Sequence, residues 1–552
     1  MVNPTTLISR TIVQELIAVG VTDVVLAPGS RSAGLALATA QADKAGAIQL
    51  HVRIDEREAG FLALGIAKAT RNAVAIIVTS GTAVANLLPA VIEAYYSGVS
   101  LIVISADRPA SSRNRMSPQT INQAGIFSDF VAATIDLAIN PNPHELEQMH
   151  AAVNSARLLR RLPVHINVQC DMPLVPDSSD VTWVPVPFSK SHQSEQYVDT
   201  VEPTREHREL PAHGVIIAGD ITRASDALHV GQLAEQLGWP VLWEPSAKAH
   251  ALTNAVAHGP LLVDNMPDPD AVLTIGTVGL SRSIMGLLRR TPLHISVHLP
   301  SNAADAPDPV GTAHEILDAL PTVSGQPDPK WLAMWRRVEA QTESVVAQAL
   351  TGNVLSGPRA ARLLWEHAAN SDQLFVASSW PVRHIEAYAP CRDGLTVFGN
   401  RGANGIDGLI STAWGTACGN AQRTYLLIGD VAFLHGASGL NVADDEVRPN
   451  LTIVVLDNDG GGIFSQLEQG APEFDEHFDK VFGTPHGRDL WVIAESYGVA
   501  ATRVTNVAEL ERALAATDRI AGVHVIVCTT GSRRDEFALM QGMKNSVADV
   551  LA

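Results

Sequence analysis

A chain of 552 residues exceeds the size at which one hydrophobic core stops growing, so we expect two or three domains and favour three. An apolar fraction of 46% and a charged fraction of 18% exclude a largely disordered or fibrous chain. A formal net charge of −19, without any run of lysine and arginine, argues against nucleic acid as a partner, so any anion site must be built from individual arginines.

The four cysteines are far apart and show neither Cys-x-x-Cys nor metal-type spacing, which fits a reduced setting. The N-terminus lacks a charged stretch followed by an apolar segment, and no apolar stretch reaches the length that spans a bilayer. We therefore expect a cytoplasmic, unexported protein that has no membrane partner.

The first part of the chain alternates helix-like and strand-like segments. Its short apolar runs predict buried strands at 24–27, 48–52, 73–79, 101–105 and 164–168. Strict alternation of strand and helix is typical of βαβ units, which build a parallel sheet covered on both faces. We assign residues 1–180 to this first domain.

A stretch rich in proline, serine and charge at 171–211 predicts a linker, and a smaller α/β unit at 205–325 follows it. The predicted strands of this second domain are 214–218, 241–244, 271–275 and 294–297. Another stretch rich in proline, aspartate and glycine, at 299–329, closes the unit. The sequence thus predicts a central α/β domain.

The third predicted domain covers residues 330–552. Ser356, Gly357 and Pro358 are typical of a helix start. The predicted strands of this domain are 374–377, 424–428, 451–456 and 523–528. The expected fold class is therefore α/β, with three α/β/α domains and mainly parallel sheets.

Two polar segments follow neighbouring strands of the third domain. Gly429 and Asp430 come directly after one strand, and Asn458 follows the next within a glycine run that includes Gly460 and Gly461. Polar groups at the carboxyl ends of parallel strands can meet at one ligand, and the Asp430 carboxylate, the Asn458 amide oxygen and the Gly460 carbonyl suit Mg²⁺ or Mn²⁺. The glycine N–H groups and a following helix N-terminus can approach a diphosphate. Two ordinary turns are the alternative interpretation.

This pair of segments resembles the signature of the thiamine diphosphate-dependent enzymes, with Val431 where a third glycine is often found. Their cofactor needs a carboxylate that hydrogen-bonds the aminopyrimidine ring, so that the imino form removes the C2 proton. Glu56 follows a predicted strand, opens a helix, and is our candidate catalytic and cofactor-binding residue. Asp55 is its rival, and an acid that merely complements the helix dipole is the alternative interpretation of Glu56.

After the next strand, Ser80, Gly81 and Thr82 would form a further part of the cofactor site. The resemblance covers nearly the whole chain and implies a thiamine diphosphate-binding fold with pyrimidine-binding, central and diphosphate-binding domains in that order. In that family the cofactor lies between subunits. The resemblance therefore implies a homodimer or homotetramer, in which Glu56 of one chain faces the metal ligands of another.

Five longer segments resemble a narrower family, the 2-succinyl-5-enolpyruvyl-6-hydroxy-3-cyclohexene-1-carboxylate (SEPHCHC) synthases of menaquinone biosynthesis. The segments are 27–32, 51–57, 105–109, 400–408 and 461–464. Members of this family decarboxylate 2-oxoglutarate on the cofactor and add the resulting succinyl carbanion equivalent to isochorismate. Such substrates carry several carboxylates, which suit bidentate arginines in an acidic protein.

The resemblance also assigns polar residues to each substrate. Those expected on the isochorismate side are Ser30, Arg31, Arg108, Gln119 and, from the central domain, Arg282. Those expected on the 2-oxoglutarate side are Ser379, Arg383 and Arg401. For any one arginine the alternative is a surface ion pair of little energetic value. Ser32 and Pro118 depart from the family pattern beside these positions, and Gly436 departs from it elsewhere.

Three apolar residues complete the predicted site. Ile406 matches the residue on which the cofactor bends, and Ile463 and Phe464 would contact the cofactor and line the reacting centre. Core packing is the alternative for all three.

Two other functions remain open from the sequence. Another thiamine diphosphate enzyme, such as a 2-oxoacid decarboxylase or an acetohydroxyacid synthase, would use pyruvate, which has no distal carboxylate to pair with Arg383 and Arg401. A non-catalytic α/β binding protein is the alternative of a different class. Intact Glu56, Asp430 and Asn458 argue against it.

Overall fold

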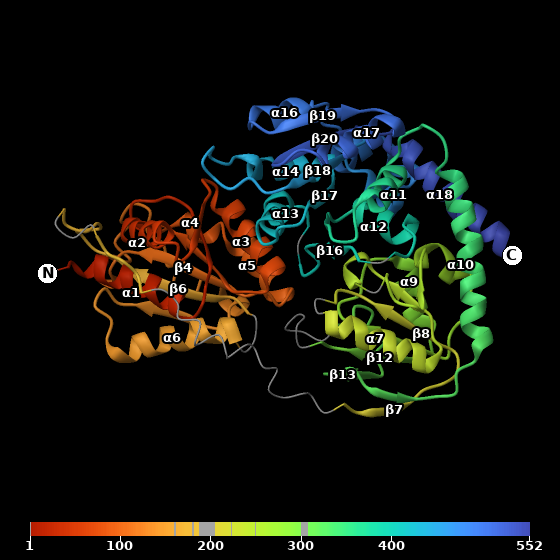
Figure 1. Ribbon diagram of the computed structural model, residues 1–552, viewed down its shortest axis with the longest axis horizontal. Helices are drawn as coiled ribbons and strands as arrows, with labels where there is room; N and C mark the ends of the chain where they lie inside the picture. The colour runs from red at the N-terminus through yellow and green to blue at the C-terminus, as the bar shows by residue number, and fades with distance from the viewer. Residues whose placement is uncertain are drawn as a thin grey trace. The chain divides into compact units, whose positions relative to one another are not determined.

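The computed structural model describes residues 2–158, 162–178, 182–186, 205–221, 224–248, 250–299, 307–392, 394–403 and 405–552 (Figure 1). By its internal contacts the chain divides into two compact units. Unit 1 comprises Met1–Val201, Gly402–Ala421 and Gly436–Pro449, and unit 2 comprises Glu202–Arg401, Gln422–His435 and Asn450–Ala552. The three domain ranges expected from the sequence stay predictions. Much of the expected linker, and Asn404 of the 400–408 segment, lie outside the described residues.

Unit 1 contains a parallel six-stranded sheet in the order β2-β1-β3-β4-β6-β5. Its strands are β1 (Asp23–Leu26), β2 (Gln49–Val52), β3 (Val74–Val78), β4 (Leu101–Asp107), β5 (Thr134–Leu137) and β6 (Val164–Gln169). The helices of this unit are α1 (Pro4–Ala18), α2 (Ala33–Lys44), α3 (Glu56–Thr70), α4 (Thr82–Ala85), α5 (Leu88–Tyr96), α6 (Pro143–Leu158) and α13 (Leu409–Cys418). Apolar side chains of α1, α2 and α6 form one core with alternate residues of the central strands, and α3 contacts α5 and the strands β1, β3 and β4.

Helix α13 comes from late in the chain but packs tightly on α3 within unit 1. A Cβ atom on Gly65 of α3 would lie 2.0 Å from the carbonyl oxygen of Thr412. A Cβ atom on Gly415 of α13 would lie 2.2 Å from the carbonyl oxygen of Leu62. The two helices therefore approach one another through glycines that no larger residue can replace without movement.

Unit 2 contains the second sheet, in the order β10-β9-β8-β11-β12-β13. Its strands are β8 (Gly214–Ala218), β9 (Val241–Trp243), β10 (Ala255–Val256), β11 (Ala271–Ile275), β12 (Leu293–Val297) and β13 (Glu315–Leu317). A separate parallel pair consists of β7 (His207–Glu209) and β14 (Thr322–Ser324). The helices here are α7 (Ala224–Leu237), α8 (Gly259–Leu262), α9 (Arg282–Arg290) and α10 (Pro329–Ala349). Alternate residues of β8 pack against α7 on one face and against α9 and α10 on the other.

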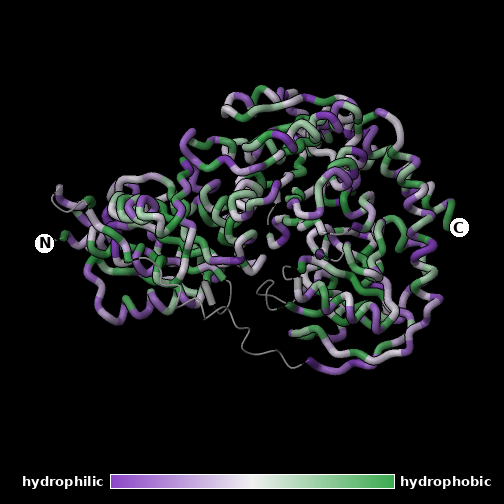
Figure 2. Tube along the Cα trace, in the orientation of Figure 1, coloured by the Kyte–Doolittle hydropathy of each residue, from purple (hydrophilic) through white to green (hydrophobic). Residues whose placement is uncertain are grey.

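The buried positions of α10 follow helical spacing. They are Trp331, Trp335, Val338, Thr342 and Val346. Hydrophobic and hydrophilic residues accordingly alternate along this helix in Figure 2. No helix in the described parts of the chain is long and apolar enough to cross a membrane.

The third sheet, also in unit 2, has the order β16-β15-β17-β18-β20-β19. Its strands are β15 (Gln373–Val376), β16 (Thr396–Phe398), β17 (Thr424–Gly429), β18 (Leu451–Asp457), β19 (Ala500–Val504) and β20 (Val523–Thr529). Its helices are α11 (Gly357–His367), α12 (Trp380–Tyr388), α14 (Asp430–His435), α15 (Asp475–Phe478), α16 (Leu490–Ser496), α17 (Val507–Thr517) and α18 (Arg533–Leu551). As predicted, α11 begins after Ser356, whose Oγ accepts a hydrogen bond from the Arg359 N–H at 3.3 Å.

Three parallel sheets flanked by helices confirm the predicted α/β class, and every strand predicted from an apolar run is present within two residues at either end. The predictions missed β5, β7, β10, β13, β14, β16 and β19. All seven lie at the edges of their sheets. Edge strands are short or partly exposed, as in the pattern of β19, and therefore lack the continuous apolar run of an inner strand.

The buried imidazole of His165 makes the stability of unit 1 depend on pH. Its Nε2 lies 2.8 Å from Ser105 Oγ, and burial lowers its pKa from 6.5 to about 4. Between these values the unfolded chain binds more protons than the folded one, so the free energy of unfolding should fall as the pH falls from 6.5 to about 4. Urea unfolding of His165→Phe should show a weaker dependence over this window. The exposed His144→Phe is the matched control, and equal slopes in both variants would contradict the prediction.

Candidate active site

Asp430 lies at the carboxyl end of β17, where α14 begins, and its side chain is buried. Parallel pairing of β17 with β18 places the ends of the two strands side by side. The Val431 N–H donates to Asp430 Oδ1 at 2.7 Å. The N–H groups of Asn458 and Gly460 donate to Oδ2 at 3.2 and 2.8 Å. The backbone thus holds the carboxylate in one orientation and joins it to the other two predicted metal ligands.

Asn458 offers a buried oxygen that has no hydrogen-bond partner. Its Nδ2 donates to the carboxylate of Glu536 on α18 at 2.9 Å, which fixes the orientation of the amide. Its Oδ1 is buried and accepts no hydrogen bond from the described residues. An unpaired buried acceptor costs about 1–3 kcal/mol. An amide oxygen held in this way fits a ligand of a hard metal ion.

The backbone of the glycine run after Asn458 leaves no room for a side chain at Gly460 or Gly461. Gly460 has a φ of +135°, and a Cβ atom there would lie 2.0 Å from the Gly483 carbonyl oxygen. A Cβ atom on Gly461 would lie 2.4 Å from the carbonyl oxygen of Phe482. The Gly460 carbonyl oxygen, the third predicted ligand, accepts a hydrogen bond from the Gly462 N–H at 2.9 Å. Its second lone pair is left for a metal ion.

His486 adds a second combination of ligands at the same place. The ligand atoms of Asp430, Asp457 and His486 all lie within 4.8 Å of one another. His486 Nε2 lies 3.3 Å from Asp430 Oδ2, and this hydrogen bond raises the pKa of the imidazole. Magnesium and manganese prefer oxygen ligands, whereas zinc accepts imidazole. The all-oxygen set is therefore the better fit for magnesium.

Glu56 and its rival Asp55 have different environments in unit 1. Asp55 is the N-cap of α3: its Oδ1 accepts from the Arg57 N–H at 2.9 Å, and its Oδ2 accepts from Ser438 Oγ at 3.2 Å. Glu56 Oε2 accepts one hydrogen bond, from Asn86 Nδ2 at 3.2 Å. No other hydrogen bond to the Glu56 carboxylate comes from the part of the chain that the structure describes. The structural role of Asp55 leaves Glu56 as the carboxylate with a free oxygen.

The loop at Ser80 and Gly81 is joined to Gln119. Ser80 Oγ donates to the Gln119 carbonyl oxygen at 2.9 Å, and Gln119 Nε2 donates to the Ser80 carbonyl oxygen at 3.1 Å. Gly81 has a φ of +85°, and its N–H donates to the buried Gln123 Oε1 at 3.0 Å. Thr82 opens α4 and is exposed. Two predicted cofactor residues and one predicted substrate residue therefore lie together, although the side-chain nitrogen of Gln119 is engaged by the loop.

Two of the predicted isochorismate arginines lie close together in unit 1. Arg31 donates to the Cys170 carbonyl oxygen at 3.1 Å, and Arg108 donates to the Gln119 carbonyl oxygen at 3.2 Å. Burial, and then the positive charge of Arg108, lower the pKa of Arg31. Ser30 is exposed next to them. Both guanidinium groups bond to neutral carbonyls, so their charges are left for an anion.

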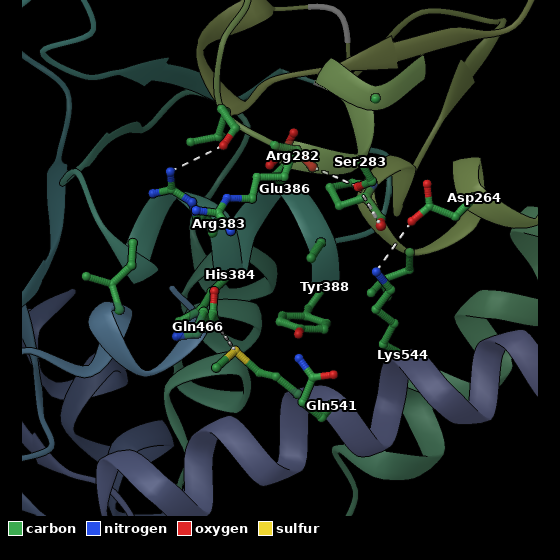
Figure 3. A pocket seen from close by; sticks show the side chains of 18 of the residues that line it. Asp264, Arg282, Ser283, Arg383, His384, Glu386, Tyr388, Gln466, Gln541 and Lys544 are labelled. Atoms are coloured by element: carbon green, nitrogen blue, oxygen red, sulfur yellow. Dashed lines mark hydrogen bonds and ion pairs between the residues drawn. The ribbon is translucent and has the colours of Figure 1, made fainter. Parts of the chain in front are cut away.

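A cavity of about 520 Å³ in unit 2 contains predicted residues from both substrate sides (Figure 3). Arg282 at the start of α9 and Arg383 on α12 both line it, together with Ile463. Arg383 donates to the carbonyl oxygens of Ser379 and Leu280 at 2.9 and 3.3 Å. Since neither acceptor is a carboxylate, the positive charge of Arg383 faces a cavity that can receive one.

Further predicted residues of the site are Ser379, Arg401, Ile406 and Phe464. Ser379 is the N-cap of α12, with a φ of +74°, and supports Arg383 through its carbonyl group rather than lining the cavity. Arg401 lies within electrostatic range of Arg383. Ile406 is half-buried in unit 1. Phe464 is half-buried and packs against Phe482, with ring centroids 5.7 Å apart.

Sequence reasoning missed the residues that orient the predicted ones. Glu536 orients Asn458, Asn86 contacts Glu56, and Gln123 holds Gly81. No motif marks these positions. Glu536 is 78 residues from Asn458 along the chain, so only the folded structure brings the two together.

Comparison with known proteins places these features in one group of enzymes. The N-terminal TPP binding domain of thiamine pyrophosphate enzymes matches residues 8–126, and their C-terminal TPP binding domain matches residues 382–528. A SEPHCHC synthase of Thermobifida fusca is 39% identical over 536 residues, which cover 93% of this chain and 94% of the relative. SEPHCHC synthases of Saccharopolyspora erythraea (36% identical; 93% of this chain, 94% of the relative) and a Nocardioides species (37%; 96% of each) are also similar.

Replacing Glu536 by glutamine should weaken the binding of divalent metal together with thiamine diphosphate. A glutamine offers one acceptor oxygen to two donors, the Asn458 amide and the Gly357 N–H, so the amide loses its fixed orientation. Loss of a residue that orients a metal ligand typically lowers metal affinity about 10-fold or more. Titration with Mg²⁺, followed by the intrinsic fluorescence of the protein, measures this. Asp535→Asn, one position earlier on α18, is the control, and equal affinities in both variants would contradict the role of Glu536.

Proposed function

This chain belongs to the family of SEPHCHC synthases, which are thiamine diphosphate-dependent enzymes of menaquinone biosynthesis, and we propose that it joins 2-oxoglutarate, after loss of CO₂, to isochorismate. The observation that carries this assignment of substrates is the cavity of unit 2. It contains Arg282 and Arg383, which the family resemblance assigns to different substrates, next to Ile463. An enzyme that forms a bond between two anions needs such a shared space.

The metal ion that we propose is Mg²⁺, held by Asp430, Asn458 and the Gly460 carbonyl group. The unpartnered Asn458 Oδ1 and the backbone-fixed Asp430 carboxylate support this choice. The glycine run would lie against the diphosphate. When bound, thiamine diphosphate supplies a nucleophilic C2 carbon and accepts the electron pair that is released with CO₂.

Glu56 is the proposed catalytic residue. Its free carboxylate oxygen would accept a hydrogen bond from the aminopyrimidine ring and stabilise the form that removes the C2 proton. Asn86 would hold the carboxylate in place through its 3.2 Å hydrogen bond. We propose that the Glu56 of one subunit serves the metal site of another, in a homodimer or homotetramer.

The arginines would bind and orient the substrates. Arg383 and Arg401 would hold the distal carboxylate of 2-oxoglutarate, because their charges are not consumed by bidentate ion pairs. Arg31 and Arg108 of one subunit and Arg282 of another would hold the carboxylates of isochorismate. Ile463 would keep water away from the reacting carbon.

The choice of donor tests the proposed reaction. Protein supplied with thiamine diphosphate and Mg²⁺ should release CO₂ from 2-oxoglutarate and consume isochorismate, and should use pyruvate poorly, since pyruvate leaves both donor-side arginines without a partner. CO₂ release and isochorismate absorbance measure the two half-reactions. Turnover with pyruvate alone would keep the cofactor and overturn the donor, whereas no turnover with either would favour a binding protein.

Glu56→Gln should abolish turnover while leaving Mg²⁺-dependent binding of thiamine diphosphate largely unchanged. The glutamine keeps the shape of the side chain but cannot stabilise the proton transfer in the ring. Exchange of the C2 proton, followed by NMR in deuterated buffer, should slow by at least about 100-fold. Asp55→Asn is the contrasting variant: it should lower stability through the weaker α3 cap and slow the exchange far less. Wild-type exchange in Glu56→Gln would remove Glu56 from the mechanism.

A further inference from the structure

Two buried carboxyl groups lie near the arginines of the donor side. Glu386 is 4% exposed and lines the same cavity as Arg383, one helical turn away on α12 (Figure 3). Glu244, which follows β9, is 5% exposed. Arg383 and Arg401 both lie within electrostatic range of this pair. Two arginines and two carboxyl groups therefore lie near one another, and both carboxyl groups are shielded from water.

The two glutamates differ in what stabilises a negative charge. Glu244 Oε1 accepts hydrogen bonds from the N–H groups of Gly279 and Leu280 at 2.7 and 2.8 Å. Burial raises the pKa of Glu244 as well, but the positive charge of Arg401 and these two hydrogen bonds oppose the rise. Glu386 receives no hydrogen bond from any residue that the structure describes. A single negative charge on the pair is therefore better stabilised on Glu244 than on Glu386.

Burial and the neighbouring Glu244 both act against ionisation of Glu386. They raise its pKa well above the ordinary value, although Arg383 and Arg401 oppose the shift. Two carboxylates that share a site in a protein ordinarily keep one proton between them. A protonated Glu386 would face the cavity as a neutral acid that can donate a hydrogen bond.

We propose that Glu386 is a specificity-determining residue that stays neutral, so that the donor-side arginines retain one uncompensated positive charge for the distal carboxylate of a 2-oxo dicarboxylate. The charges of Arg383 and Arg401 exceed that of ionised Glu244 by one positive unit. A neutral Glu386 preserves this excess, and its O–H group is an additional donor toward the carboxylate. This inference rests on the proposed function, because it takes the cavity as the donor site.

Binding of the donor should then depend on pH. Raising the pH until Glu386 ionises would remove the excess charge, so binding of a dicarboxylate should weaken as the pH rises. The other charged and titratable groups around Glu386 are the arginines Arg282, Arg383 and Arg401, Glu244, His384 and Tyr388. Asp264 and Lys544 line the same cavity as an ion pair, with Lys544 Nζ 3.4 Å from Asp264 Oδ2. The arginines remain charged throughout, and burial lowers the pKa of His384 to about 3 and raises the pKa of Tyr388 above its ordinary value. The difference between wild type and Glu386→Gln isolates the contribution of Glu386 from those of the other groups, Lys544 included.

Glu386→Gln tests this with a permanently neutral side chain. In the wild-type holoenzyme, KM for 2-oxoglutarate should rise by about 10-fold between neutral and alkaline pH, with a smaller change in kcat. In Glu386→Gln, KM at neutral pH should stay near the wild-type value and the alkaline rise should disappear. Glu386→Asp keeps a titrating group and should keep the rise, which makes the test independent of whether the glutamine variant folds well. Glu366→Gln, on the neighbouring α11, is the matched control.

A measurement without turnover separates this inference from the proposed function. Succinate has the carboxylates of the donor but no 2-oxo group, and its binding to the holoenzyme can be followed by calorimetry. Succinate affinity that falls with pH in wild type but not in Glu386→Gln would support the role of Glu386, even if 2-oxoglutarate is not turned over. Two results would overturn it: equal pH dependence in both proteins, or a large change of affinity in Glu386→Gln at neutral pH.

Discussion

One oxygen atom sets the requirements for the rest of the metal site. Asn458 Oδ1 is buried without a hydrogen-bond partner, a state that costs about 1–3 kcal/mol unless a cation binds to it. The Glu536 carboxylate fixes this oxygen in position, because it accepts a hydrogen bond from the nitrogen of the same amide. The pairing of β17 with β18 brings Asp430 alongside. The glycine run must then turn at a φ that only Gly460 adopts easily. These features stabilise one another and have no evident purpose without a ligand.

The net negative charge of the chain repels its proposed anionic substrates, and individual arginines offset this repulsion locally. The protein has a formal net charge of −19, yet its predicted substrates are anions. Arg31, Arg108 and Arg383 donate to backbone carbonyls in place of carboxylates. Such contacts orient a guanidinium group without neutralising it. A neutral Glu386 extends the same principle, because it fills the cavity wall without cancelling a charge.

The inner strands and the motif residues could be predicted from the sequence, because both leave local patterns. Continuous apolar runs mark the inner strands, whereas edge strands such as β13 and β16 are too short and too exposed to stand out. Asp430 and Asn458 could be predicted as ligands because each is a polar residue that follows an apolar strand. Glu536, Asn86 and Glu386 leave no such pattern, since their roles arise from contacts between distant segments. The N-cap role of Asp55, the rival of Glu56, is likewise visible only in the folded structure.

We propose that the metal-binding oxygens of Asp430, Asn458 and Gly460 in one chain and Glu56 of another chain form a single active site. Co-expression of Glu56→Gln and Asp430→Asn chains with different tags, followed by purification of the mixed dimer, tests it directly. Each variant alone should be inactive. The mixed dimer should regain about half of the wild-type activity, because one of its two sites then receives both intact groups and the other receives neither. A mixed dimer as inactive as its parents would contradict the claim and place both groups of each site in the same chain.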